Sequence, residues 1–147
     1  MANNKAIFLI EDNPSDIELT KRALKRGHVG NEIIVAEDGE EALDYLFGTG
    51  RHIGPNLPEL PAIVLLDLKL PKVSGLEVLR RIREHARTRR LPVIILTTSR
   101  EEGDLGASYD HGANSYVVKP VDFSRFQQAI EQLGLYWLVI NEAPPDV

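Results

Sequence analysis

Acidic, hydroxyl and amine side chains follow four of the short apolar runs in this sequence. If these runs are parallel strands, their ends meet at one edge of a sheet, which is where open α/β sheets bind ligands. The side chains at these ends are Glu11-Asp12, Asp67, Thr97-Thr98 and Lys119-Pro120. The sequence therefore predicts one polar site assembled from four separate segments.

The three acids of this group suggest a site for a divalent cation. Carboxylates gathered at one sheet edge repel one another, which raises their affinity for a proton or a hard cation. Mg²⁺ commonly binds through one or two carboxylates together with phosphate oxygens. We therefore expect Glu11 and Asp12 to hold Mg²⁺ beside Asp67.

An aspartate beside a metal, a lysine and a hydroxyl is a plausible phosphoryl acceptor, because aspartate carboxylates act as covalent nucleophiles and the transferring group needs cations and donors. Asp67 would attack, Lys119 would pair with one phosphoryl oxygen, and Thr97 would donate to another. Movement of Thr97 would vacate space that Tyr116 on the neighbouring strand could fill. Thr97 and Tyr116 are thus predicted to form a reversible switch.

Each of these residues also has an ordinary structural explanation. Glu11 and Asp12 would offset the positive end of a following helix, and Asp67 would cap a turn. Thr97 would be a β-branched strand residue, and Lys119-Pro120 a simple exit from a strand. The interpretation of these residues as one phosphoryl-transfer site is favoured, because four independent strand ends each supply one member of it.

The order of the elements predicts an α/β fold. Strands are expected at residues 6–10, 33–36, 63–66, 93–96 and 116–118, and helices at 14–26, 40–47, 75–87, 101–111 and 123–133. Right-handed βα units give a doubly wound, five-stranded parallel sheet with helices on both faces. Residues 48–61, rich in Gly and Pro, are expected to form a long loop.

Composition limits the classes of partner and location. The 147 residues carry 17 Lys and Arg against 22 Asp and Glu, a net charge of −5, and no Cys. No run approaches the roughly 20 apolar residues of a membrane span. These features predict a cytoplasmic protein that binds other proteins and does not bind nucleic acid or a membrane.

Residues 1–135 would form the domain. They are followed by an extension at 136–147 that is too short for a separate output domain.

These motifs resemble the receiver domains of response regulators in two-component systems. The resemblance rests on Glu11-Asp12-Asn13, Asp67-Leu68-Lys69, Ser74-Gly75, the Thr97-Thr98 strand end and Tyr116-Val117-Val118-Lys119-Pro120. It implies strand order 2-1-3-4-5 and phosphoryl transfer from a sensor histidine kinase to Asp67, followed by autodephosphorylation. Mg²⁺ would bind Asp12, Asp67 and the backbone carbonyl of Lys69, with Glu11 acting through water.

The same resemblance implies finer features. The Lys119-Pro120 bond would be cis, and Lys69 and Ser99 would tune how long the phosphoryl group lasts. The long loop and the apolar C-terminus are similar to single-domain regulators that serve phytochromes. This narrower match favours a phytochrome-type kinase and a homodimer that uses the tail residues Tyr136, Trp137 and Leu138; the alternative is that the tail packs on its own domain.

Other functions fit the motifs less well. A phosphatase of the haloacid dehalogenase type would need a second aspartate at the position of Lys69. A flavodoxin-like carrier needs a phosphate-binding loop where Glu11-Asp12 would repel phosphate. A receiver that serves only as a phosphate sink stays open. The arginines at positions 80, 81, 83, 87, 89 and 90 are expected to complement a helix dipole.

Overall fold

The computed structural model describes residues 5–27, 29–49 and 58–145. Its strands are β1 (Ile7–Ile10), β2 (Ile33–Ala36), β3 (Ile63–Leu66), β4 (Val93–Thr97) and β5 (Ser115–Val118). Its helices are α1 (Pro14–Arg26), α2 (Gly39–Phe47), α3 (Gly75–Glu84), α4 (Glu102–Asp110) and α5 (Phe123–Leu135), followed by a π-helical segment at Tyr136–Ile140. The five alternating strands and helices confirm the predicted architecture.

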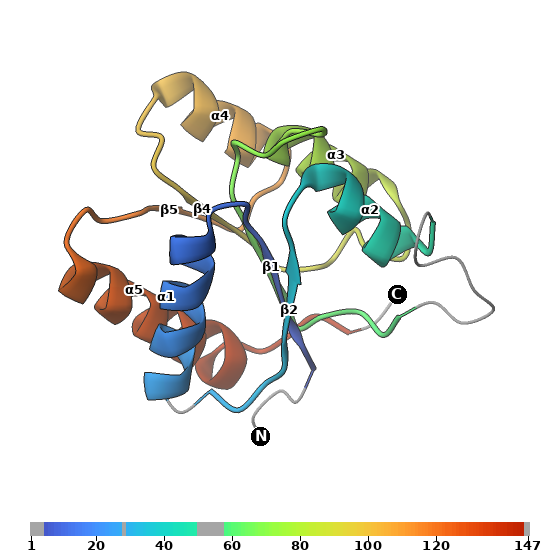
Figure 1. Cartoon of the computed structure of the whole chain (residues 1–147). Helices are drawn as coiled ribbons and strands as arrows, with labels where there is room; N and C mark the ends of the chain where they lie inside the picture. The colour runs from blue at the N-terminus through green and yellow to red at the C-terminus, as the bar shows by residue number, and fades with distance from the viewer. Residues whose placement is uncertain (1–4, 28, 50–57, 146–147) are drawn as a thin grey trace.

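The five strands form one parallel sheet in the order β2-β1-β3-β4-β5, as predicted. Helices α1 and α5 cover one face, and α2, α3 and α4 lie on the other (Figure 1). The inner strands β1, β3 and β4 are buried along their whole length, whereas the edge strands β2 and β5 are mostly half-buried. Helices on both faces explain why the inner strands are almost uniformly apolar.

Alternation along the strands divides the core into two clusters. Phe8 and Ile10 of β1 face the α2–α3 side, where Val78 and Ile82 of α3 pack against them. Neighbouring strand residues point the other way, into a cluster that includes Leu24 of α1 and Ile130 of α5. The sheet is therefore packed between two apolar layers, which position its carboxyl edge.

Local capping explains where α1 begins. The side-chain oxygen of Asn13 accepts hydrogen bonds from the amides of Ser15 at 2.9 Å and Asp16 at 3.2 Å, and Pro14 occupies the first helical position. This arrangement satisfies backbone donors that have no partner within the helix. It turns the chain directly from the end of β1 into α1.

Helix α3 ends at Glu84, so the prediction that it runs to residue 87 is wrong. The hydroxyl of Thr88 donates to the carbonyl of Ile82 at 2.6 Å, which gives one of the last helical carbonyls a side-chain partner. Near the same end of α3, Arg83 donates to the carbonyls of Leu91 at 2.7 Å and Gly112 at 2.9 Å. A helix-dipole explanation of the arginine cluster is thus incomplete, because Arg83 ties α3 to two other loops.

The C-terminal extension packs partly on its own domain. Leu138 is 3% exposed within the α1–α5 core, and Trp137 packs against the same cluster. Leu138 is therefore unavailable to a partner in this conformation, contrary to its expected place in a dimer contact. At the end of α5 and in the extension, the large apolar residues that are exposed are Leu135, Tyr136, Val139 and Ile140. The predicted loop at 48–61 falls largely outside the described residues; Gly48, in the left-handed conformation, ends α2.

Candidate functional site

The carboxyl edge of the sheet brings four of the predicted residues into one buried polar cluster. Glu11 directly follows β1, Asp67 follows β3, Thr97 ends β4 and Lys119 follows β5. Glu11, Asp67, Thr97 and Lys119 are at most 8% exposed. Polar groups buried to this extent need partners: Lys119 contacts Glu11 and Asp67, whereas the Thr97 hydroxyl contacts the amide of Ser99.

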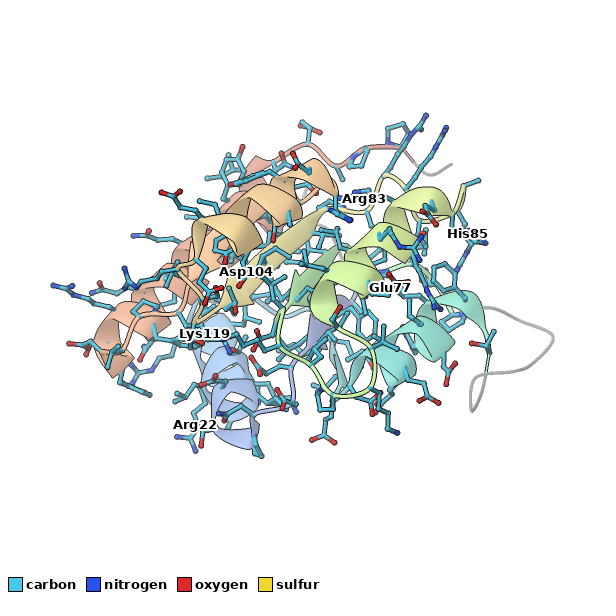
Figure 2. All side chains as sticks on the ribbon, turned by 90° about the horizontal axis from the view of Figure 1, so that it is seen from above. Arg22, Glu77, Arg83, His85, Asp104 and Lys119 are labelled. Atoms are coloured by element: carbon cyan, nitrogen blue, oxygen red, sulfur yellow. The ribbon has the colours of Figure 1, made fainter. Side chains whose placement is uncertain are left out.

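Lys119 is the centre of the cluster, lying beside the first turn of α1 (Figure 2). Its amine donates to Asp67 Oδ2 at 3.0 Å, to Asp16 Oδ2 at 2.8 Å and to Glu11 Oε1. Lys119 thus shares one site with the acids at the strand ends, as predicted, and Asp16 is an additional partner. One buried cation thus holds together an acid of α1 and the acids that follow β1 and β3.

The acids also form a site that fits a divalent cation. Glu11, Asp12 and Asp67 each place a carboxylate oxygen within 4.8 Å of the other two. Asp12 is exposed, whereas Glu11 and Asp67 are buried, so the group of acids reaches the surface at Asp12. Oxygen-only ligands and two or more carboxylates are the donor set that hard divalent cations prefer.

Burial perturbs the ionisation of this cluster. Burial raises the pKa of Glu11 to about 7, the hydrogen bond from Lys119 opposes the rise, and the charge of Asp67 adds to it. Burial alone would lower the pKa of Lys119, but the hydrogen bonds to Asp16 and Glu11 and the charge of Asp67 outweigh it, so its pKa lies above the ordinary value. Lys119 therefore remains a cation, and a metal ion would favour the ionised form of Glu11.

Asp67 is held by the loop that follows it. Its Oδ1 accepts a hydrogen bond from the amide of Lys69 at 3.2 Å, while the Lys69 side chain is exposed. The amide of Gly75 donates to the carbonyl of Leu68 at 2.9 Å. A Cβ atom at Gly75 would lie 2.2 Å from the carbonyl oxygen of Asp67. Gly75 thus permits α3 to start directly against the Asp67 backbone.

Thr97 and Tyr116, the predicted switch residues, contact the loop between β4 and α4. The Thr97 hydroxyl accepts from the amide of Ser99 at 3.4 Å, and Ser99 Oγ donates to Asp104 Oδ2 at 2.6 Å. The Tyr116 hydroxyl donates to the carbonyl of Ser99 at 3.0 Å. Thr97 and Tyr116 are therefore linked through the backbone of Ser99, next to the acidic cluster.

The expected cis bond between Lys119 and Pro120 is wrong, because that bond is trans in this structure. The trans form is the favoured isomer of most such bonds. The Lys119 amine already reaches three carboxylates with the bond in this form. Assembly of the cluster therefore does not require the cis isomer here.

Two contributors to the site were missed in the sequence. Asp16 lies in the first turn of α1, where an acid is ordinarily explained by the helix dipole, so its spacing gave no sign of a contact with Lys119. Gly39 begins α2, and a Cβ atom there would lie 2.0 Å from the carbonyl oxygen of Val73 in the loop after β3. Only a three-dimensional arrangement reveals either contact.

The helices in the described part of the chain include none long and apolar enough to cross a bilayer.

Comparisons with known proteins agree with this geometry. FilR2 of Methanothrix harundinacea, a probable methanogenesis regulatory protein, is 42% identical over 141 residues, 94% of this chain and 86% of FilR2. Response regulator Rcp1 of Synechocystis is 36% identical over 134 residues, 91% of this chain and 89% of Rcp1. The solved Mn²⁺-bound form of Rcp1 has a TM-score of 0.88 at 35% identity, covering 96% of this chain and 99% of that one.

A third relative is the phosphorylated cyanobacterial phytochrome response regulator RcpA. Its structure has a TM-score of 0.89 at 37% identity and covers 97% of this chain and 100% of RcpA. The family model described as the response regulator receiver domain matches residues 7–131. This match spans the five strands, the Lys119 cluster and most of α5, and the chain belongs to the response regulator receiver domain family.

Proposed function

We propose that the chain accepts a phosphoryl group from a sensor histidine kinase on Asp67 and signals through contacts with other proteins. The observation that carries this proposal is the position of Asp67 Oδ2, 3.0 Å from the Lys119 amine and within a group of acids suited to a divalent cation. The family membership supports the same role.

In the proposed reaction, a carboxylate oxygen of Asp67 forms a bond to the phosphorus of the kinase phosphohistidine. The phosphorus–nitrogen bond breaks, and its electron pair returns to the imidazole. Lys119 would donate to a phosphoryl oxygen and offset its charge, and the Thr97 hydroxyl would donate to another. The same pair of residues would hold the phosphoryl group after transfer.

We propose Mg²⁺ as the metal, held by Asp12, Asp67 and the backbone carbonyl of Lys69, with Glu11 acting through water. When bound, the ion would neutralise charge on the phosphoryl oxygens. Support comes from the oxygens of Glu11, Asp12 and Asp67, which lie within 4.8 Å of one another, and from the Mn²⁺ bound to Rcp1. The exposed Asp12 would let the ion enter from solvent.

The proposed switch uses Thr97 and Tyr116. If Thr97 turns toward the phosphoryl group, its contact with the Ser99 amide is lost, and the loop that Tyr116 holds through the Ser99 carbonyl becomes free to move. Lys69 and Ser99, which flank Asp67 and Thr97, would set the rate of autodephosphorylation. Ser99 is buried and bound to Asp104, so its effect would depend on that contact.

A phytochrome-type kinase is the proposed donor, supported by the likeness to RcpA, a phytochrome response regulator. A homodimer is proposed through the exposed apolar residues at the end of α5 and in the tail, Leu135, Tyr136, Val139 and Ile140. A phosphatase of the haloacid dehalogenase type is not favoured, because Lys69 stands where that class needs its second aspartate.

Intact-mass measurement tests the proposed acceptor. Incubation with acetyl phosphate and Mg²⁺ should add one phosphoryl group, and either EDTA or Asp67→Asn should prevent the addition. Asp110→Asn, which changes an exposed carboxylate at the end of α4, serves as the control and should label normally. Normal labelling of Asp67→Asn would reject Asp67 as the acceptor.

A further inference from the structure

Asp16 contacts the amine that the proposed reaction depends on. Lys119 Nζ lies 2.8 Å from Asp16 Oδ2 and 3.0 Å from Asp67 Oδ2, and its remaining contact is with Glu11. A lysine ammonium has three N–H donors, so each donor has one carboxylate partner. The Lys119 amine is thus held from three directions, one of which is supplied by α1.

The usual role of an acid in the first turn of a helix does not account for the direction of the Asp16 side chain. In a capping box, the acid at this position would accept from the amide of the capping residue. Here the amide of Asn13 donates to Glu11 Oε2 at 3.2 Å, while the amide of Asp16 donates to Asn13 Oδ1. The carboxylate of Asp16 is therefore left to Lys119.

Asp16 also differs from the other two partners of Lys119. In the part of the chain that the structure describes, the acids grouped closely enough to share a metal are Glu11, Asp12 and Asp67. Glu11 and Asp67 would thus be shared between the cation and the amine, whereas Asp16 serves the amine alone. Its side chain is 23% exposed, against 5% for Lys119, so it closes the solvent side of the pair.

We propose that Asp16 is a positioning residue for phosphoryl transfer, an inference that rests on the proposed function of Asp67. When Asp67 becomes an acyl phosphate, the N–H that now contacts it turns to a phosphoryl oxygen. The contacts with Asp16 and Glu11 hold the flexible lysine stem in place during this exchange. Asp16 does not draw the amine away from Asp67, because both contacts exist at once.

The test measures two quantities in Asp16→Ala, Asp16→Asn and a control. The first is the rate constant of phosphorylation by acetyl phosphate at saturating Mg²⁺, and the second is the Mg²⁺ dissociation constant from calorimetry. Glu18→Ala removes the same charge from the same helix, at a side chain that is 58% exposed and paired with Arg22. Circular dichroism and thermal unfolding verify that each variant is folded, and Asp16→Asn preserves the side-chain shape if the alanine variant is unstable.

The inference predicts a rate constant at least about tenfold lower for Asp16→Ala than for Glu18→Ala, because positioning and a charge-assisted hydrogen bond are lost. Asp16→Asn should be intermediate, since its amide oxygen still accepts a hydrogen bond, and Mg²⁺ affinity should change by less than about twofold in both. Equal or faster phosphorylation of Asp16→Ala overturns the inference, as does an equal loss of Mg²⁺ affinity. If the wild type is not labelled, or Asp67→Asn is labelled, the proposed function itself fails.

Discussion

The Lys119 amine lies 3.0 Å from Oδ2 of Asp67, although 52 residues separate the two in the sequence. Both follow strands of one parallel sheet, and β4 lies between those strands. The contact therefore spans the end of β4, where Thr97 is located. This geometry places an amine, a carboxylate and a hydroxyl at the ends of three neighbouring strands.

Lys119→Met should destabilise the metal-free protein and increase its response to Mg²⁺. The variant leaves buried acids without their cation, and breaking a buried ion pair costs about 3–5 kcal/mol. Mg²⁺ binds only the folded site and should restore part of the loss. Urea unfolding with EDTA and with Mg²⁺ measures both effects, with the exposed Lys25→Met as the control. Wild-type stability of Lys119→Met in EDTA would show that the amine does not balance the acids.

Gly75→Ala should destabilise the fold, because the added Cβ would lie 2.2 Å from the carbonyl oxygen of Asp67. Backbone must move to relieve such overpacking, at a cost of about 2 kcal/mol or more. Gly103→Ala is the matched control, since no atom lies within 4 Å of its Cβ position in α4. The control should be stabilised by up to about 1 kcal/mol through helix propensity. Similar unfolding midpoints for the two variants would contradict the close approach at Gly75.

Arg83→Ala should cost about 2–3 kcal/mol, because Arg83 donates to three backbone carbonyls and to the side chain of Asn114. Arg80 lies one turn away and pairs with Glu77 and Glu84 on the surface. Arg80→Ala should therefore cost less than about 1 kcal/mol. Chemical denaturation of both variants measures the difference. An equal cost would mean that both arginines act mainly on the helix dipole.

Tyr116→Phe should loosen the loop between β4 and α4. It leaves the carbonyl of Ser99, which the hydroxyl contacts at 3.0 Å, without this donor, at a cost of about 1 kcal/mol. Hydrogen exchange should become faster in the backbone amides from residue 99 to the start of α4. Tyr109→Phe, at a tyrosine that is 51% exposed, removes a surface hydroxyl and should leave this exchange unchanged. Unchanged exchange in Tyr116→Phe would remove support for the switch.

The sequence allowed the sheet and the main cluster to be predicted because both follow from strand ends. Parallel strands place Glu11, Asp67, Thr97 and Lys119 at one edge, so the position of each apolar run was enough to predict their proximity. The strand order and the direction of all five strands were confirmed. This information lies in local patterns and in the handedness of βα units.

The features that sequence reasoning missed depend on side-chain directions or on contacts between distant segments. Asp16 has the position of an ordinary helix acid, and its contact with Lys119 depends on how α1 lies against the end of β5. Arg83 has the position of a cation that complements the helix dipole, but its guanidinium donates hydrogen bonds to the carbonyls of Leu91 and Gly112 in two loops. The tail was predicted only as apolar, and the burial of Leu138 depends on how α5 continues past Leu135.

Localisation of the phosphoryl group tests the central claim most directly. After treatment with acetyl phosphate and Mg²⁺, borohydride reduction converts an aspartyl phosphate into homoserine, which mass spectrometry locates in a peptide. The account predicts homoserine at position 67, dependent on Mg²⁺, and none at Asp12 or Asp16. Reduction at another carboxylate, or a phosphoryl group on a residue that borohydride does not convert, would contradict the account.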